Sequence, residues 1–313
     1  MTSPIAICIE RHKSKYMQRY LTYMRIIARS FLYPMRIHVV TSNFSQKIYC
    51  ILFHYKYAVL SLLRSACRYF NIRNNFPLIT PKYDFIVRNS FGKFLTRKNT
   101  TDYTIISDYN EFGSIKHFEG IQEGIFIDVG ANIGKWSIFV GRRSHDSVQV
   151  FAVEPVPENF CILKENILLN ELENVIPINC ALSDEEGKTI MHINRDSYDT
   201  CAIASKVKEI DKSLNIEYAE VKLTTIDRMI IDYSIIAENV KLIKIDTEGH
   251  ELEVLMGARN LLSSNSCLKI IFECLDPNKL NIIKSYLLNF GYITYSIDKS
   301  NHFSVRNNPS SED

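Results

Sequence analysis

The segment IFIDVGANIGKWS, residues 125–137, decides the fold. A run of β-branched and aromatic residues ends at Asp128, a glycine-containing turn follows, and a helix is predicted near 134–143. Further strands are predicted at 148–153, 175–178, 188–193, 221–223, 240–245, 268–272 and 292–297, and further helices at 157–170, 251–262 and 278–289. Strands that alternate with helices predict an α/β fold with a doubly wound, mostly parallel sheet.

The site is expected at one edge of this sheet, because ligands of such folds bind outside the carboxyl ends of the strands. Polar residues that directly follow predicted strands are therefore the candidates. They are Asp128, the loop 130–134, Glu154, Ser183, Asp184, Asp246, Glu248, His250 and Glu273.

The loop after the first strand indicates what kind of ligand binds. Gly130 and Gly134 lie four residues apart, which differs from the G-x-G-x-x-G pattern of dinucleotide sites. Gly130 is expected to let a ligand approach the backbone, and Gly134 to allow close helix packing. Asp128 would repel a phosphate but suits a cationic or hydroxyl-bearing ligand, and S-adenosylmethionine fits that description. Glu154 follows the second strand, where an acid characteristically accepts hydrogen bonds from ribose hydroxyls.

Six segments together resemble the FkbM family of S-adenosylmethionine-dependent methyltransferases. They are IDVGANIGKWS (127–137), VEPVPENF (153–160), LKENILLN (163–170), ALSDEEG (181–187), TTID (224–227) and LIKIDTEGHELEVLMGA (242–258). The similarity covers about residues 121–275, and the K-I-D-x-E-G-x-E element at 244–251 is its most specific part.

This resemblance implies a class I methyltransferase (Rossmann-like) fold and S-adenosylmethionine as the cofactor. It implies methyl transfer to a hydroxyl on a sugar, glycolipid or small molecule. Carried over by position, the cofactor-binding residues are Asp128, Gly130, Asn132, Gly134 and Glu154, with Ser183 and Asp184 near the adenine.

Methylation of an alcohol requires a group that accepts the hydroxyl proton. We expect Asp246 to be this base or to orient the acceptor, with Glu248, His250 and Glu273 as further candidates. Lys244 lies two residues before Asp246, so both side chains are expected on one face of the strand, where Lys244 could keep the acids ionised. A fixed ion network beside the pocket is the alternative interpretation. No metal is expected, because the spacing of these residues matches no metal-binding motif.

The charge distribution divides the chain. The formal net charge is +2, but residues 1–100 contain 17 Lys and Arg against two acids, Glu10 and Asp84. We predict a basic, aromatic-rich helical extension at 1–80 with helices at 16–33 and 48–63, and a boundary near 71–83. Lead-in strands are predicted at 81–120, the S-adenosylmethionine-binding domain at 121–300, and a polar tail at 301–313.

Three roles of the extension remain open: a cap docked on the acidic domain, a surface held at an anionic membrane, or a collector of anionic acceptors. The segment 48–63 is too short to span a bilayer and contains His54 and Lys56, which favours a buried or interfacial helix.

The cysteines and the N-terminus bear on the compartment. The eight cysteines form no C-x-x-C pair, which predicts buried, reduced thiols in a cytoplasmic protein with peripheral membrane contact as an option. The N-terminal residues do not read as a secretory signal.

Other functional classes fit the sequence less well. The absence of G-x-G-x-x-G disfavours a nicotinamide-dependent oxidoreductase. Many amino-group methylases carry N/D-P-P-Y/F where this chain has D-T-E-G, which disfavours base methylation and makes nucleic acid a weaker partner. Ribose methylation of RNA, and a non-catalytic scaffold at a membrane or nucleic acid, remain as alternatives.

Overall fold

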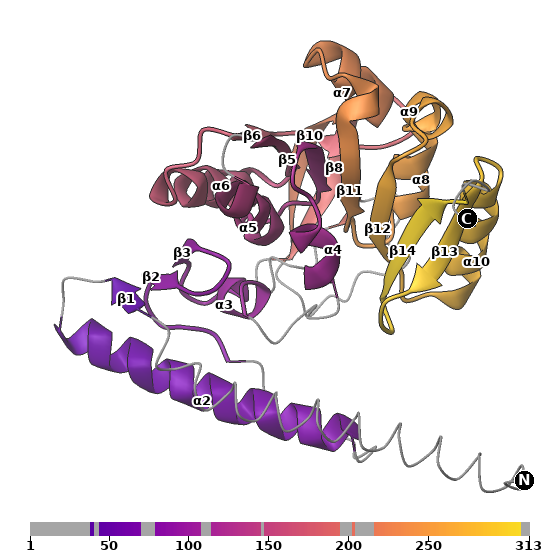
Figure 1. Ribbon diagram of the computed structural model, residues 1–313. Coiled ribbons are helices and arrows are strands. Elements are labelled where there is room, and N and C mark those ends of the chain that lie inside the picture. Colours follow the sequence, from indigo (N-terminus) through magenta and orange to yellow (C-terminus); the bar gives the residue numbers. More distant parts are fainter. Residues whose placement is uncertain are drawn as a thin grey trace, which may run out of the picture.

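The computed structural model describes residues 38–40, 44–69, 79–107, 114–144, 147–194, 202–203 and 216–307. Its centre is a seven-stranded sheet with the strand order β13-β14-β12-β11-β4-β5-β6 (Figure 1). These strands are β4 Gly124–Val129, β5 Val148–Val153, β6 Val175–Ile178, β11 Val240–Ile245, β12 Lys269–Glu273, β13 Tyr292–Ser296 and β14 Asn301–Arg306. Neighbours are parallel except at β14, which runs antiparallel to both β12 and β13. The predicted doubly wound sheet is therefore confirmed.

The strand order reverses between β4 and β11. From β4 the chain proceeds outward to β5 and β6, and after a long connection it returns to β11 on the other side of β4. Both strands are almost continuously buried, as expected for parallel strands that are covered on both faces. Their carboxyl ends therefore meet at the switch point where a doubly wound sheet binds its ligand.

Two layers of helices cover the sheet. Phe126 and Val150 belong to a hydrophobic cluster with residues of α4 Ile115–Glu119, α5 Lys135–Ser144 and α6 Pro157–Leu169. Ile127 and Ile243 belong to a second cluster with residues of α7 Ile226–Asp232, α8 Glu251–Met256, α9 Arg259–Ser264 and α10 Pro277–Leu288. Because side chains alternate along a strand, Asp128 faces the same side as Phe126, toward α4–α6.

The predicted helix 251–262 is divided into α8 and α9 at Gly257. A Cβ added at Gly257 would lie 1.9 Å from the carbonyl oxygen of Ser183. The Gly257 carbonyl also accepts a hydrogen bond from the amide of Asp227 at 2.9 Å. The hydrophobic spacing continues across this point, but the close backbone contact ends the first helix, so the single-helix prediction was wrong.

A smaller four-stranded sheet, ordered β7-β10-β8-β9, lies between β6 and β11 in the chain. Its strands are β7 Ala181–Leu182, β8 Gly187–Asn194, β9 Ala202–Ile203 and β10 Ile216–Thr224. The strands predicted at 188–193 and 221–223 exist, but they pair with each other in antiparallel fashion and do not join the main sheet. Their apolar residues form a cluster of their own with Val156, beside the carboxyl end of β5.

The N-terminal region packs against the α4–α6 side of the domain. It contains β1 His38–Val40, α2 Phe44–Tyr69, β2 Phe85–Arg88, β3 Lys93–Thr96 and α3 Asp102–Ile105. The strands form an antiparallel sheet ordered β1-β2-β3, and α2 runs along it in Figure 1. Phe53 and Tyr57 of α2 pack against Tyr103, and Phe53 also contacts Phe85. These contacts bury one face of the helix, while its other face remains exposed.

Several predicted boundaries need correction. Residues 301–306 form β14 rather than part of a polar tail, because they pair with two antiparallel neighbours that bury the polar side chains of Asn301, His302 and Ser304. The extension 1–80 contains the strand β1 as well as a helix. The helix predicted at 16–33 lies outside the described residues.

Not all described cysteines are buried. Cys50, Cys180 and Cys274 are, but Cys161 and Cys267 are exposed free thiols. The prediction of uniformly buried thiols was therefore wrong for these two.

The contact at Gly257 generates a stability prediction. Gly257→Ala should lower the free energy of unfolding by roughly 1–3 kcal/mol, because a well-packed backbone must shift to admit the methyl group. Gly120→Ala is a matched control, since both glycines end helices with similar right-handed backbone angles and a Cβ at Gly120 meets nothing nearer than 3.7 Å. Urea unfolding measures both, and equal stability of the two variants would contradict the account.

Candidate active site

A cavity of about 620 Å³ opens at the carboxyl ends of β4, β5, β11 and β12. Its volume lies within the range of small-molecule sites in enzymes. It brings together most of the predicted site residues: Asp128, Gly130, Asn132, Glu154, Lys244, Asp246, Glu248, His250 and Glu273. Gly134, Ser183 and Asp184 are not among its lining residues.

Gly130 fixes the distance between the ends of β4 and β11. It has a φ of +77°, and a Cβ there would lie 1.9 Å from the carbonyl oxygen of Asp246. Its amide donates to the carbonyl of Val153 at 3.0 Å, which also ties the turn to β5. The glycine was expected to admit a ligand, but the close approach that the structure shows is to the chain at Asp246.

The rest of the glycine loop presents polar groups to the cavity. Asn132 adopts a φ of +52°, which turns its backbone amide toward Glu154. Its buried Oδ1 accepts no hydrogen bond from any described residue, so it can accept one from a ligand. Gly134 has a φ of +94°, and a Cβ there would lie 2.7 Å from Leu163 of α6. The predicted role of Gly134 in close helix packing therefore agrees with the geometry.

Glu154 is buried and held by several donors. Its carboxylate accepts hydrogen bonds from the amides of Asn132 at 2.8 Å and Val156 at 2.9 Å, and from the side chain of Asn159. Burial raises the pKa of Glu154 to about 7, although these donors oppose the shift. Its two oxygens are thereby fixed at the end of β5, facing the cavity.

Asp128 lies near the end of β4, two residues before Gly130. Ser137, in the first turn of α5, donates to Asp128 Oδ2 at 2.6 Å. The strand register aligns Asp128 with Lys244 of β11, so both side chains point to the α4–α6 face of the sheet. The acid of β4 and the cation of β11 therefore belong to one polar cluster.

The second wall of the cavity contains Lys244, Asp246 and Glu273. Lys244 Nζ lies 2.8 Å from Asp246 Oδ2, so the structure pairs it with Asp246, one of the two acids that the sequence offered as partners, the other being Glu273. Burial alone would raise the pKa of Asp246, but Lys244, a hydrogen bond with Glu273 and the charge of Lys135 outweigh it and hold that pKa below its ordinary value. Burial and the charge of Asp246 raise the pKa of Glu273 to about 7. The two acids thus form a carboxylate–carboxylic acid pair near neutral pH.

Lys135 is a site residue that the sequence analysis missed. It is almost completely buried, lines the cavity and lies 5.0 Å from the ring centroids of both Phe91 and Trp136. Its charge contributes to the low pKa of Asp246. The signal was its place directly after Gly134, at the first position of the helix.

The loop after Asp246 is anchored by Glu251 rather than by Glu248. Glu251 is buried and accepts hydrogen bonds from the amides of Thr247 at 3.2 Å and Gly249 at 2.9 Å. Glu248 is exposed at the cavity mouth with a φ of +52°. The repeated acids of the E-G-H-E element therefore differ in role, since one holds the loop and the other faces the opening.

His250 connects the loop to Ser183. The Ser183 hydroxyl donates to Asp184 at 3.0 Å, so it accepts from His250 Nε2, which lies 2.9 Å away. His250 is buried and lines the cavity, whereas Ser183 lies behind its wall. The cavity surface beside Ser183 consists of Cys180, Ala181 and Leu182.

Other lining residues come from elements whose place in the fold the sequence did not reveal. Ile105 of α3, Met191 of β8 and Ile203 of β9 add apolar surface. The turn 298–300 before β14 adds polar groups, and Asn301, the first residue of β14, lines the cavity and pairs with Glu273 in the sheet. Among the residues that the structure describes, no group of three or more His, Cys, Asp or Glu side chains could hold a metal.

The strand order, the antiparallel β14 and the acids Asp128 and Glu154 at the carboxyl ends of β4 and β5 define a class I methyltransferase fold. The chain belongs to the FkbM methyltransferase family, because the model of the methyltransferase FkbM domain matches residues 128–294. S-adenosylmethionine is the cofactor of this family, and the acceptors around Asn132 and Glu154 suit its hydroxyl and amino donors.

Individual relatives agree with this assignment. Methyltransferase sdnD from Sordaria araneosa is 27% identical over 42% of this chain and 59% of its own length. Hexuronic acid methyltransferase AglP from Haloferax volcanii is 30% identical over 53% of this chain and 64% of its own length. The chain thus spans about three-fifths of the length of these relatives.

Among solved structures, a precorrin-6y C5,15-methyltransferase from Geobacter metallireducens is similar. It aligns with a TM-score of 0.39 and 12% identity, over 63% of this chain and 88% of its own.

Proposed function

We propose that the protein transfers a methyl group from S-adenosylmethionine to a hydroxyl of a sugar, glycolipid or small metabolite. The observation that carries this proposal is the division of a single cavity into two acidic walls. Asp128 and Glu154 form the wall at β4 and β5, and the Asp246–Glu273 pair forms the wall at β11 and β12. The name of the relative AglP, a hexuronic acid methyltransferase, supports a saccharide acceptor.

The cofactor would lie along the glycine loop. Glu154 would accept hydrogen bonds from the ribose hydroxyls, as an acid after the second strand does in related sheets. Asp128 and the buried Oδ1 of Asn132 would accept from the other donors of the cofactor. Ser183 and Asp184 would act near the adenine only indirectly, through His250 and the neighbouring wall.

The acceptor hydroxyl would lie against Asp246. When bound, S-adenosylmethionine supplies a methyl carbon on a positively charged sulfur, which leaves as a neutral thioether. Asp246 would take the hydroxyl proton as the oxygen attacks, and Lys244 would keep Asp246 ionised and in place. Glu273 would tune the basicity of Asp246, because a proton on Glu273 is shared with it.

Two other candidates have weaker positions. His250 Nε2 is engaged with Ser183, which leaves it poorly placed as a base. Glu248 is exposed at the mouth of the cavity and would contact the acceptor rather than take its proton.

Glu154→Ala should weaken S-adenosylmethionine binding by roughly 1–3 kcal/mol, through the loss of hydrogen bonds to a charged group. Isothermal titration calorimetry measures this, with Glu165→Ala as the control, since Glu165 is an exposed acid on α6. Absence of binding by the unaltered protein would contradict the proposed function.

Asp246→Asn should retain cofactor affinity and lose turnover. At saturating cofactor, kcat of the unaltered protein should rise as pH increases through about 7, because Glu273 then loses the proton that it shares with Asp246. Glu273→Gln cannot titrate and should remove this pH dependence. Turnover that is unchanged in Asp246→Asn would exclude Asp246 as the base.

We infer also that α2 provides peripheral contact with anionic membranes. Its exposed apolar side chains follow helical spacing and form one stripe: Phe44, Ile48, Ile51, Leu52, Tyr55, Val59 and Leu63. The exposed Lys47 and Lys56 flank the stripe on a helical projection, which is the arrangement of an interfacial helix. The basic excess of residues 1–100 favours anionic lipid. No helix in the described parts of the chain is long and apolar enough to cross a membrane.

Sedimentation of the full-length protein with vesicles tests this contact. Binding should require phosphatidylserine, weaken with salt, and fall in the double variant Leu52→Glu/Val59→Glu. Ile231→Glu/Leu288→Glu is the control, because these side chains are equally exposed on α7 and α10. Equal binding by both double variants would contradict the role of α2.

A further inference from the structure

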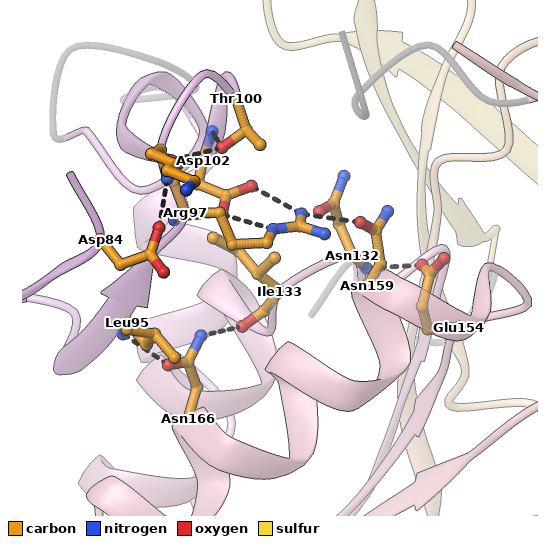
Figure 2. Close-up of polar contacts among 11 residues, drawn as sticks. Asp84, Leu95, Arg97, Thr100, Asp102, Asn132, Ile133, Glu154, Asn159 and Asn166 are labelled. Carbon is orange, nitrogen blue, oxygen red and sulfur yellow. Dashed lines mark hydrogen bonds and ion pairs between the residues drawn. The ribbon is translucent and has the colours of Figure 1, made fainter. Parts of the chain in front are cut away.

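Helix α6 presents a row of asparagines to the edge of β3. Asn170 accepts from the amide of Lys93 at 2.9 Å and donates to its carbonyl at 2.7 Å. Asn166 accepts from the amide of Leu95 at 2.7 Å and donates to the carbonyl of Ile133 at 2.9 Å (Figure 2). The side-chain amides of Asn170 and Asn166 thus pair with the backbone of β3 as a neighbouring strand would. Asn166 also connects β3 to the glycine loop through Ile133.

The next alternate residue along this edge is Arg97, and its partner is Asn159 in the first turn of α6. Arg97 Nη2 donates to Asn159 Oδ1 at 2.8 Å. The guanidinium is held by Asp102, whose two oxygens accept from Nε at 2.8 Å and from Nη2 at 2.7 Å. Asp102 is fully buried, so this ion pair is fixed in position.

Arg97 thereby determines which way the Asn159 amide points. A guanidinium can only donate hydrogen bonds, so the group that faces it must be Oδ1. The amide nitrogen is then directed to Glu154, which accepts a hydrogen bond from this side chain. Figure 2 shows Asp102, Arg97 and Asn159 joined in a row, with Glu154 beyond them and joined to Asn132.

We propose that Arg97 is a positioning residue for the cofactor site, which orients Glu154 toward the ribose hydroxyls through Asn159. This inference rests on the proposed function. It also assigns a role to the segment before the matched domain, because Arg97 precedes residues 128–294. The cofactor site is then completed by the small N-terminal sheet.

The charge state of Glu154 should depend on the same row. Asp128 on β4 opposes ionisation of Glu154, while the amides of Asn132 and Val156 and the side chain of Asn159 favour it. Burial has already raised the pKa of Glu154 to about 7. Loss of the Asn159 donor would raise that pKa further, so more of the protein would carry a protonated Glu154 at neutral pH. A protonated carboxyl group accepts hydrogen bonds from ribose hydroxyls less well than a carboxylate does.

Cofactor affinity as a function of pH tests the proposal, measured by calorimetry between pH 6 and 9 on the full-length protein. Asn159→Ala should bind S-adenosylmethionine roughly tenfold more weakly at pH 7, as for a lost hydrogen bond to a charged group. The midpoint of its pH dependence should move to higher pH. Arg97→Met combined with Asp102→Asn should also weaken cofactor binding and raise the pH midpoint, without leaving a buried charge unpaired. Arg97→Lys, which keeps a positively charged donor, should largely retain the affinity of the unaltered protein.

Asn170→Ala is the matched control, because it loosens the same contact between α6 and β3 without touching Glu154. Its cofactor affinity and pH midpoint should equal those of the unaltered protein. Equal loss in Asn170→Ala and Asn159→Ala, or an unchanged midpoint in Asn159→Ala, would overturn the proposal. Failure of the unaltered protein to bind the cofactor would instead refute the proposed function.

Discussion

The geometry of the site depends on the contact between Gly130 and the carbonyl of Asp246. A methyl group at residue 130 would lie 1.9 Å from that oxygen, so only glycine allows the ends of β4 and β11 to come this close. Asp128 lies near the end of β4, just before this contact, and Glu154 follows β5, to which Gly130 is hydrogen-bonded, while Asp246 follows β11. This backbone contact therefore sets the separation between the proposed cofactor acids, Asp128 and Glu154, and the proposed base Asp246.

The pKa values of the cavity acids are set by burial on the one hand and by nearby charges and hydrogen-bond donors on the other. At Asp246, the positive charges of Lys244 and Lys135 overcome burial and keep the carboxylate ionised. At Glu154 and Glu273, burial prevails and raises both pKa values to about 7. The cavity thus contains acids that respond differently to pH, which is common where acid–base chemistry is carried out. The contacts of α6 with β3 extend this control to a segment that precedes the methyltransferase domain.

The sequence predicted the main sheet from its hydrophobic runs, and it predicted the acids of the cavity from their positions at the ends of those runs. Asp128, Glu154, Asp246 and Glu273 could be located by their positions after hydrophobic runs. Residues that contact the site from other elements could not be located in this way. Lys135 has the position of an ordinary helix residue, and Arg97 and Asn159 are distant from each other in sequence. The strand β14 was missed because its polar residues, among them Asn301 and His302, are buried by antiparallel neighbours that the sequence does not specify. Gly257 ended a helix through a contact with Ser183 that hydrophobic spacing cannot reveal.

The central claim is that this cavity transfers methyl groups to hydroxyls. Its most direct test is incubation of the protein and methyl-labelled S-adenosylmethionine with fractionated cell extract, followed by analysis of glycans, lipids, small molecules and RNA. The account predicts label in an oxygen-linked methyl group of a glycan, lipid or small-molecule fraction. Label confined to RNA would contradict the proposed acceptor class, and no protein-dependent label in any fraction would contradict the claim itself.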